Sequence, residues 1–164
     1  MLSSTVLLNT TATVAPHELT PTADFIKTIE IAAPADRIWN VMADVAYWPE
    51  WTASVTTVKR LDAGPFGIGS RARVKQPKLL HAVWSVTALD PGRSFTWMSR
   101  MPGLRILGFH QVESIGDRSR VTLSIQFIGL FRAFAIRASR KLNEEYLNME
   151  AMGLKRRCES GNKS

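Results

Sequence analysis

Residues 121–159 read VTLSIQFIGLFRAFAIRASRKLNEEYLNMEAMGLKRRCE, and this stretch decides the fold because its hydrophobic period changes partway along. Up to Phe127, apolar and polar residues alternate, which predicts a half-buried strand. From Leu130 to about Glu159 there is no proline and the apolar residues fall at helical spacing. About 28 residues of helix would reach roughly 42 Å, long enough to lie along a whole curved sheet.

The residues at this helical spacing form the face of the helix that is expected to meet the sheet. They are Phe131, Phe134, Ala135, Ala138, Leu142, Tyr146, Met149 and Gly153. Arg140, Lys141, Asn143 and Glu144 are expected to face the other way.

The chain before residue 121 predicts a strand, one or two helices and then further short strands. A strand over 24–33 ends at Pro34, and Pro34 with Asp36 suits the start of a helix. A short second helix is expected near 46–53. Strands follow at 55–61, 70–76, 82–89, around 95–98 and 104–115, separated by Gly- and Pro-containing turns. Short strands with short turns favour an antiparallel meander, whose apolar face the long helix would cover.

Length and composition limit the class of protein. The chain has 164 residues, enough for one domain with one hydrophobic core. With 45% hydrophobic and 21% charged residues it is typical of soluble globular proteins, and no apolar run approaches the ~18 residues of a membrane span. The single cysteine, Cys158, excludes an internal disulfide and a Cys-rich zinc site, and it fits a reducing compartment such as the cytoplasm.

The two ends of the chain differ from its middle. Residues 1–23 contain six Thr, two Pro and no Lys or Arg, which predicts a disordered or loosely attached tail. The segment 160–164 is interpreted in the same way. The folded domain is therefore expected over about 24–159.

The chain is basic, with 21 Lys and Arg against 14 Asp and Glu, a net charge of +7. Solubility explains such a balance, and so does an anionic partner. Nucleic acid is not expected, because no nucleic-acid motif is present and the basic residues are not interleaved with exposed aromatics. A weak contact with an anionic membrane or an acidic partner stays open; it would use Arg71, Arg73, Lys75 and Lys78 and would weaken steeply with salt.

Several segments resemble one known superfamily when taken in order. They are IAAPADRIW at 31–39, Asp44 followed by WPEW at 48–51, WSV at 84–86, DPGRSFTW at 90–97, GFHQV at 108–112 and GLF at 129–131. Over about residues 24–155 the chain resembles the START-like (SRPBCC) superfamily, in particular its polyketide cyclase/dehydrase and lipid-transport group.

The resemblance implies an α+β helix-grip fold. In this fold a curved seven-stranded antiparallel sheet wraps around a long C-terminal helix, and one or two short helices follow the first strand. It also implies a cavity between sheet and helix that receives hydrophobic ligands. Members include aromatic polyketide cyclases, sterol and phospholipid carriers, quinone-binding proteins and plant hormone receptors, so the resemblance does not imply one chemistry.

His110 is the first candidate for chemistry. Alternation within 104–115 places His110 and Val112 on the inner face, and Gly108 is expected to leave space beside the imidazole. Histidine titrates near neutrality, so it could act as a general acid or base there. The alternative is a histidine whose hydrogen bonds are satisfied within the core.

Other candidates line the same expected cavity. Trp84 and Trp97 fall on inward positions of adjacent strands, where they would stack on a flat ligand or simply pack in the core. Gln76 and Ser99 share the inward phase and need polar partners. The predicted ligand-binding set is Gln76, Trp84, Trp97, Ser99, His110, Phe127, Phe134, Tyr146 and Met149. The candidate catalytic residues are His110 and Tyr146.

No metal site or cofactor is expected. The three histidines, His17, His81 and His110, show no metal-ligand spacing. No Gly-x-Ser-x-Gly elbow occurs, and the glycines between 64 and 69 are not followed by the Lys-Ser/Thr of a phosphate loop.

Two functions follow from these residues. The first is binding of a hydrophobic small molecule of lipid, quinone or aromatic polyketide type; an interior filled by side chains would count against it. The alternative is a polyketide cyclase/dehydratase-type enzyme in which His110 is the acid or base, and Tyr146 or Ser99 orients the substrate. The identity of the ligand and the oligomeric state stay open.

Overall fold

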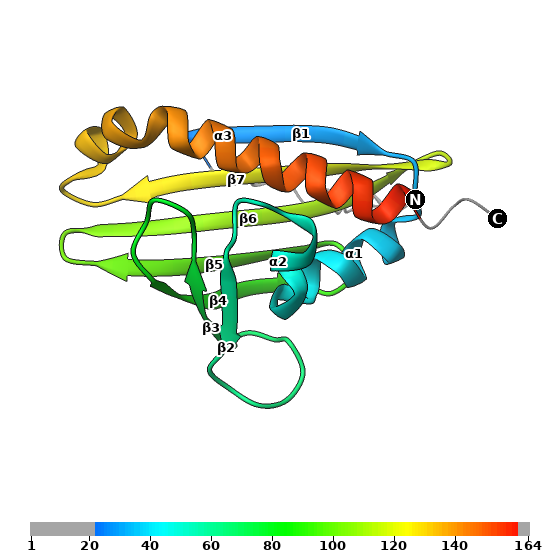
Figure 1. The fold of residues 1–164 in the computed structure, drawn as a ribbon, viewed down its shortest axis with the longest axis horizontal. Helices are drawn as coiled ribbons and strands as arrows, with labels where there is room; N and C mark the ends of the chain where they lie inside the picture. The colour runs from blue at the N-terminus through cyan, green and yellow to red at the C-terminus, as the bar shows by residue number, and fades with distance from the viewer. Residues whose placement is uncertain (1–21, 161–164) are drawn as a thin grey trace, which may run out of the picture.

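One antiparallel sheet of seven strands forms the framework of the protein (Figure 1). The computed structural model describes residues 22–160. The strands are β1 (Phe25–Ile31), β2 (Thr57–Arg60), β3 (Arg71–Lys75), β4 (Ala82–Asp90), β5 (Ser94–Met101), β6 (Leu104–Ile115) and β7 (Arg118–Ile128). Their order is β1-β7-β6-β5-β4-β3-β2, so β2 to β7 form a meander and β1 closes the other edge beside β7. The predicted helix-grip architecture is confirmed.

The helices also follow the sequence pattern. Helix α1 (Ala35–Ala43) starts directly after Pro34 and buries Ile38 and Met42. The expected second helix is a 3-10 turn, η1 (Val45–Tyr47), that continues into the short helix α2 (Trp48–Trp51). The long helix α3 spans Arg132–Glu159.

The strand register sets which side chains face inward. Across the centre of the sheet Phe95 pairs with His110, and His110 pairs with Leu123. Two residues further along β5, Trp97 pairs with Gly108 of β6. Partners across a ladder share a face of the sheet, so the inward phase expected for His110 and Trp97 is confirmed by their register and burial.

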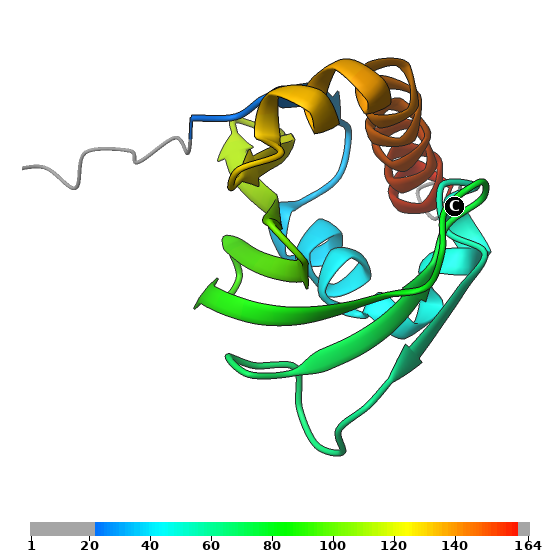
Figure 2. The same ribbon diagram turned by 90° about the vertical axis from the view of Figure 1, so that its left-hand side faces the viewer.

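Helix α3 does not cover the sheet evenly. Its main strand contacts are β1 and β7, and its C-terminal half also meets α1 and α2 (Figures 1 and 2). The fully buried side chains of α3 begin only at Tyr146. The apolar face expected of its N-terminal half is wrong at Phe131 (51% exposed), Phe134 (73% exposed) and Ala138, whereas Ala135 packs against the core. The physical reason is that this half runs along the edge strand β1, so much of its circumference faces solvent.

Some predictions fall outside the described residues. The tails expected at 1–23 and 160–164 lie almost entirely there. Among residues 22–160, no helix is long and apolar enough to cross a membrane. The same part of the chain contains no group of three metal-ligating side chains.

Candidate functional site

An aromatic cluster surrounds His110 on the inner face of the sheet. Phe95 stacks on the imidazole, with ring centroids 4.5 Å apart and planes 6° from parallel. Trp97 meets the imidazole edge-on at 5.7 Å, and Trp48 lies 5.2 Å from it. Trp84 extends the cluster, 5.1 Å from Trp97. Strands β4 to β6 and helix α2 therefore supply one continuous aromatic group, with a histidine at its centre.

Trp48 enters this cluster because η1 and α2 form a short turn over the sheet. Its indole Nε1 donates a hydrogen bond to the Met42 carbonyl oxygen at 3.0 Å, which leaves the apolar part of the ring to pack inward. The ring lies 4.9 Å from that of Trp97 and is almost completely buried. The interior next to His110 is thus occupied by a side chain from the helical segment.

Gly108 makes room for Trp97 rather than for a ligand. A Cβ atom at position 108 would lie 2.5 Å from Trp97 Nε1 and 2.9 Å from its Cδ1, well inside van der Waals contact. The indole therefore lies across the β6 backbone where a side chain would otherwise stand. The expectation that Gly108 leaves empty space beside His110 is wrong in this structure.

His110 forms a buried pair with Glu150 of α3. The distance from His110 Nε2 to Glu150 Oε1 is 2.8 Å, and both side chains are buried. Because a carboxylate only accepts, Nε2 carries the hydrogen and donates it; this assigns the tautomer from the partner. His110 Nδ1 is buried and has no partner among the described residues. The ring is therefore satisfied at one nitrogen and unsatisfied at the other.

This arrangement allows two kinds of chemistry. With Nε2–H held by Glu150, Nδ1 presents a lone pair that can accept a hydrogen bond from a ligand. The same lone pair can accept a proton, and the Glu150 carboxylate would then stabilise the imidazolium.

The Tyr146 hydroxyl is directed elsewhere. It donates a hydrogen bond to the Pro77 carbonyl oxygen in the loop between β3 and β4. Burial raises the pKa of Tyr146, with a smaller effect from the nearby Glu145 carboxylate. In this structure the Tyr146 proton joins α3 to the 76–81 loop instead of pointing at His110.

The remaining predicted residues divide into three groups by the exposure of their side chains. Ser99 and Phe127 are buried, and Phe127 packs edge-on against Phe25 at 6.2 Å. Gln76 and Met149 are half-buried. Phe134 lies outside the cluster, on the exposed side of α3.

Three residues at the cluster were not singled out from the sequence as site candidates: Trp48, Phe95 and Glu150. A signal for Glu150 existed, because it stands four residues after Tyr146 and three before Gly153, on the same helix face. A carboxylate on a buried face requires a partner, and His110 is the nearest titratable residue on the facing strands by phase. For Trp48, the sequence pattern does not distinguish a residue of the aromatic cluster from an ordinary core residue.

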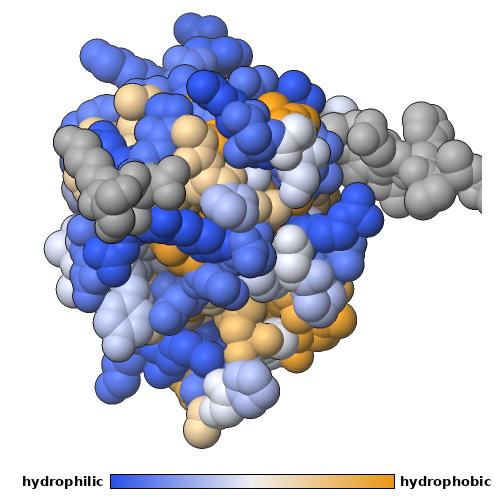
Figure 3. Space-filling view, turned by 90° about the vertical axis from the view of Figure 1, so that its right-hand side faces the viewer, coloured by the Kyte–Doolittle hydropathy of each residue, from blue (hydrophilic) through white to orange (hydrophobic). Residues whose placement is uncertain are grey.

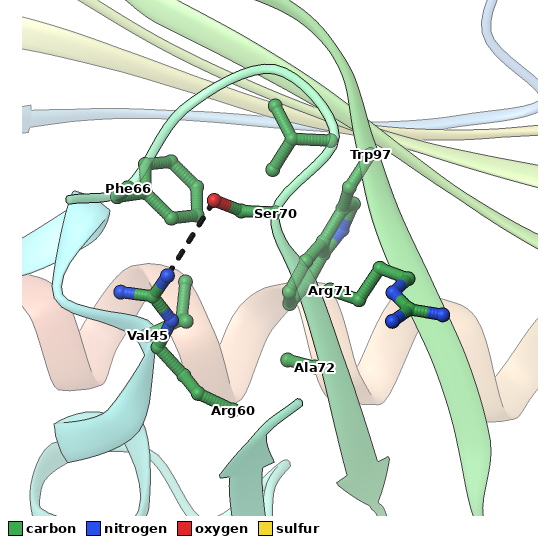
Figure 4. A pocket seen from close by; sticks show the side chains of 8 residues that line it. Val45, Arg60, Phe66, Ser70, Arg71, Ala72 and Trp97 are labelled. Atoms are coloured by element: carbon green, nitrogen blue, oxygen red, sulfur yellow. Dashed lines mark hydrogen bonds between the residues drawn. The ribbon is translucent and has the colours of Figure 1, made fainter. Parts of the chain in front are cut away.

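One hollow reaches the cluster, at its β2–β3 side (Figure 4). Side chains leave no room in it for a water molecule. Its lining consists of Val45, Arg60, Phe66, Ser70, Arg71, Ala72, Val86 and Trp97. Arg60 donates to Ser70 Oγ at 3.5 Å and to Asp62 at 2.5 Å. The backbone N–H of Arg71, with the Arg60 guanidinium, lowers the pKa of Asp62. This side of the cluster is closed.

Comparison with known proteins points to one family. A family model described as polyketide cyclase/dehydrase and lipid transport matches residues 22–159. A comparison with curated proteins found no matching sequence.

Solved structures share the fold at low sequence identity. A protein from Thermus thermophilus is 18% identical with a TM-score of 0.68, covering 84% of this chain and 98% of that one. The Zhui aromatase/cyclase of Streptomyces sp. R1128 is 19% identical with a TM-score of 0.65, covering 85% and 98%. The di-domain aromatase/cyclase BexL of the BE-7585A biosynthetic pathway is 20% identical with a TM-score of 0.65, covering 85% and 47%.

Proposed function

Because the chain belongs to the polyketide cyclase/dehydrase and lipid transport family, we propose that it binds a hydrophobic small molecule between the sheet and α3. The ligand is of lipid, quinone or aromatic polyketide type. The observation that carries this proposal is the unpartnered Nδ1 of His110 inside a shell of aromatic rings. Aromatic faces suit a flat apolar ligand, and a buried acceptor without a donor costs about 1–3 kcal/mol that a ligand hydroxyl would recover.

Side chains fill the space at the cluster, which is the result that counts against a preformed cavity there, so binding requires these side chains to move. The first half of α3, residues 132–145, is the part best able to yield, since none of its side chains is fully buried. The second half is held in several ways. Glu150 pairs with His110, and Lys155 Nζ donates to the Glu30 carbonyl oxygen at 2.7 Å. We expect the ligand to enter beneath the first half while the second stays in place.

The test is native mass spectrometry of gently purified protein, followed by solvent extraction and identification of anything bound. In parallel, a fatty acid, a short-chain quinone and a polycyclic phenol are titrated while tryptophan fluorescence is followed. Trp97→Phe should weaken the binding of a ligand in the cluster, whereas Tyr47→Phe, at a position of η1 where the side chain is 55% exposed, is the control and should not. If none of the three probes changes the fluorescence and nothing is extracted, the binding proposal is wrong.

A second candidate is a cyclase or dehydratase, and the His110–Glu150 pair is the observation that favours it. Nδ1 of His110 would accept a proton from a carbon between two carbonyls. The carbanion would attack a more distant carbonyl of the same substrate, and the imidazolium would return its proton to the oxygen of that carbonyl, so that one C–C bond forms. Glu150 would be the positioning residue, because it sets the tautomer and stabilises the charged ring.

Turnover of a poly-β-ketone thioester tests this candidate. His110→Ala should abolish cyclisation, and Glu150→Gln should reduce it and move the pH profile, since an amide holds the tautomer without the charge. Gln111→Ala, on the opposite face of β6, is the control and should leave turnover unchanged. Undiminished turnover in His110→Ala would rule out the acid–base role. Tyr146→Phe separately tests whether Tyr146 orients the substrate.

The cytoplasm is the proposed location. The support for it is the single thiol, Cys158, which is buried.

A further inference from the structure

One end of the molecule concentrates both positive charge and exposed apolar side chains. Three segments make up this basic end: the last residue of β3 with the β3–β4 loop (75–81), the β5–β6 hairpin (100–105) and the start of α3 with its preceding loop (129–141). They hold eight of the 21 Lys and Arg and none of the 14 Asp and Glu. The rest of the chain is therefore almost neutral.

The three segments lie at the same end of the molecule, with the β3–β4 loop across from the other two (Figures 1 and 2). The hairpin and the start of α3 lie together at the left of Figure 1, and Figure 2 looks onto that end. Phe131 N–H donates to the Gly103 carbonyl oxygen at 3.4 Å, which joins these two segments. The hydrogen bond from Tyr146 to Pro77 joins the β3–β4 loop to α3. Figure 3 shows the opposite end, where hydrophilic side chains predominate and apolar ones appear between them.

The apolar side chains of the basic end protrude. Six of the eleven large apolar side chains exposed among the described residues belong to it: Leu79, Leu80, Met101, Leu130, Phe131 and Phe134. Leu80 is 89% exposed and Leu130 is 86% exposed. They stand on three separate segments of the chain. A bilayer accepts such scattered protrusions without shape complementarity, whereas a folded partner would need a matching surface.

The charges of this end are available to a partner. Arg132 is paired with Asp24, and Arg140 with Glu144. The six others form no ion pair with any carboxylate among the described residues: Lys75, Lys78, Arg100, Arg105, Arg137 and Lys141. Long cationic side chains around protruding apolar ones suit an interface of anionic headgroups above acyl chains.

We infer that the basic end docks on an anionic lipid bilayer, with Leu80 and Leu130 entering the interface and the unpaired cations meeting the headgroups. The inference rests on the proposed function in one respect: the bilayer is then the source or destination of the hydrophobic ligand. The first half of α3, which we expect to yield for the ligand, follows Leu130 closely in the chain and carries Phe134, one of the exposed apolar side chains of this end.

Co-sedimentation with phosphatidylcholine vesicles, with and without phosphatidylglycerol, tests the docking. Binding is expected only to the anionic vesicles and should weaken as salt rises. Arg137→Gln with Lys141→Gln should weaken it about fivefold per charge. Leu80→Ser with Leu130→Ser should weaken it about tenfold or more per side chain. These side chains are exposed, so the circular dichroism spectrum should not change.

The matched control is the other basic surface, on β3. Arg71→Gln with Arg73→Gln removes two charges there, and Ile68→Ser removes a side chain that is 71% exposed; these changes should leave vesicle binding intact. Three results would each overturn the inference. They are equal binding to both vesicle types, vesicle binding that the leucine changes do not affect, and vesicle binding that is lost only in the control variants at Ile68, Arg71 and Arg73. If vesicles bind but no hydrophobic ligand is ever found, the docking stands and the proposed function fails. If a ligand is bound in stoichiometric amount but the protein does not bind vesicles, the proposed function stands and the docking inference fails.

Discussion

Gly153 is the point at which α3 is seated on the rest of the protein, and replacing it with alanine tests that seating. A Cβ atom at position 153 would lie 2.1 Å from the Trp51 carbonyl oxygen, 3.0 Å from the Trp51 carbonyl carbon and 3.2 Å from Thr52 Cα. Ordinary contact begins near 3.4 Å, so the shortfall at the oxygen exceeds an ångström. All three atoms belong to backbone and no flexible side chain can move aside.

Two effects oppose each other in Gly153→Ala. Alanine is favoured over glycine inside a helix by about 1 kcal/mol. Against this, overpacking costs about 1–3 kcal/mol, and a shift of α3 large enough to relieve the contact would strain the hydrogen bond from His110 to Glu150, worth about 1.5–3 kcal/mol. The backbone clash should win, and we expect the free energy of unfolding to fall by about 2–4 kcal/mol.

Urea unfolding followed by tryptophan fluorescence measures this change. Ala138→Gly, at an exposed position of the same helix, is the control and should cost about 1 kcal/mol from helix propensity alone. A Gly153→Ala protein as stable as the parent, or more stable, would refute the seating argument.

Three further predictions concern side chains outside the aromatic cluster or at its margin. Burial raises the pKa of Cys158 to about 11, so the native thiol should not react with an aromatic disulfide reagent at pH 8, although it should react once the protein is unfolded in urea; fast reaction of the native protein would contradict this. Tyr146→Phe removes the hydrogen bond to Pro77 and should lower the free energy of unfolding by about 1 kcal/mol and speed proteolysis in the 76–81 loop, with unchanged cleavage as the contrary result. The hydrogen bond from Lys155 lowers the pKa of Glu159 below 4.5, so its contribution to stability is present above that value and is lost as the pH falls through the lowered pKa. Glu159→Gln should therefore make the fall in stability on acidification shallower in pH-dependent urea unfolding, and parallel curves would disprove the assignment.

Much of the fold could be predicted because it depends on local periodicity. The alternation in 121–128, the proline-free stretch after it and the turns between the earlier strands each report the backbone conformation of their own segment. The same alternation correctly placed His110 and Trp97 on the inner face, since neighbouring side chains on a strand point to opposite faces.

The sequence by itself determined the element order, the inward phase of the strands and the family to which the chain belongs. Only the tertiary structure decided that α3 lies over the β1 edge, that Trp48 and Trp97 fill the space near Gly108, and that Glu150 pairs with His110 across 40 residues of sequence. Periodicity says which side of an element is apolar, but it does not say where along the sheet a helix is seated. That depends on close contacts between distant segments, such as Gly153 against Trp51, which no local pattern contains.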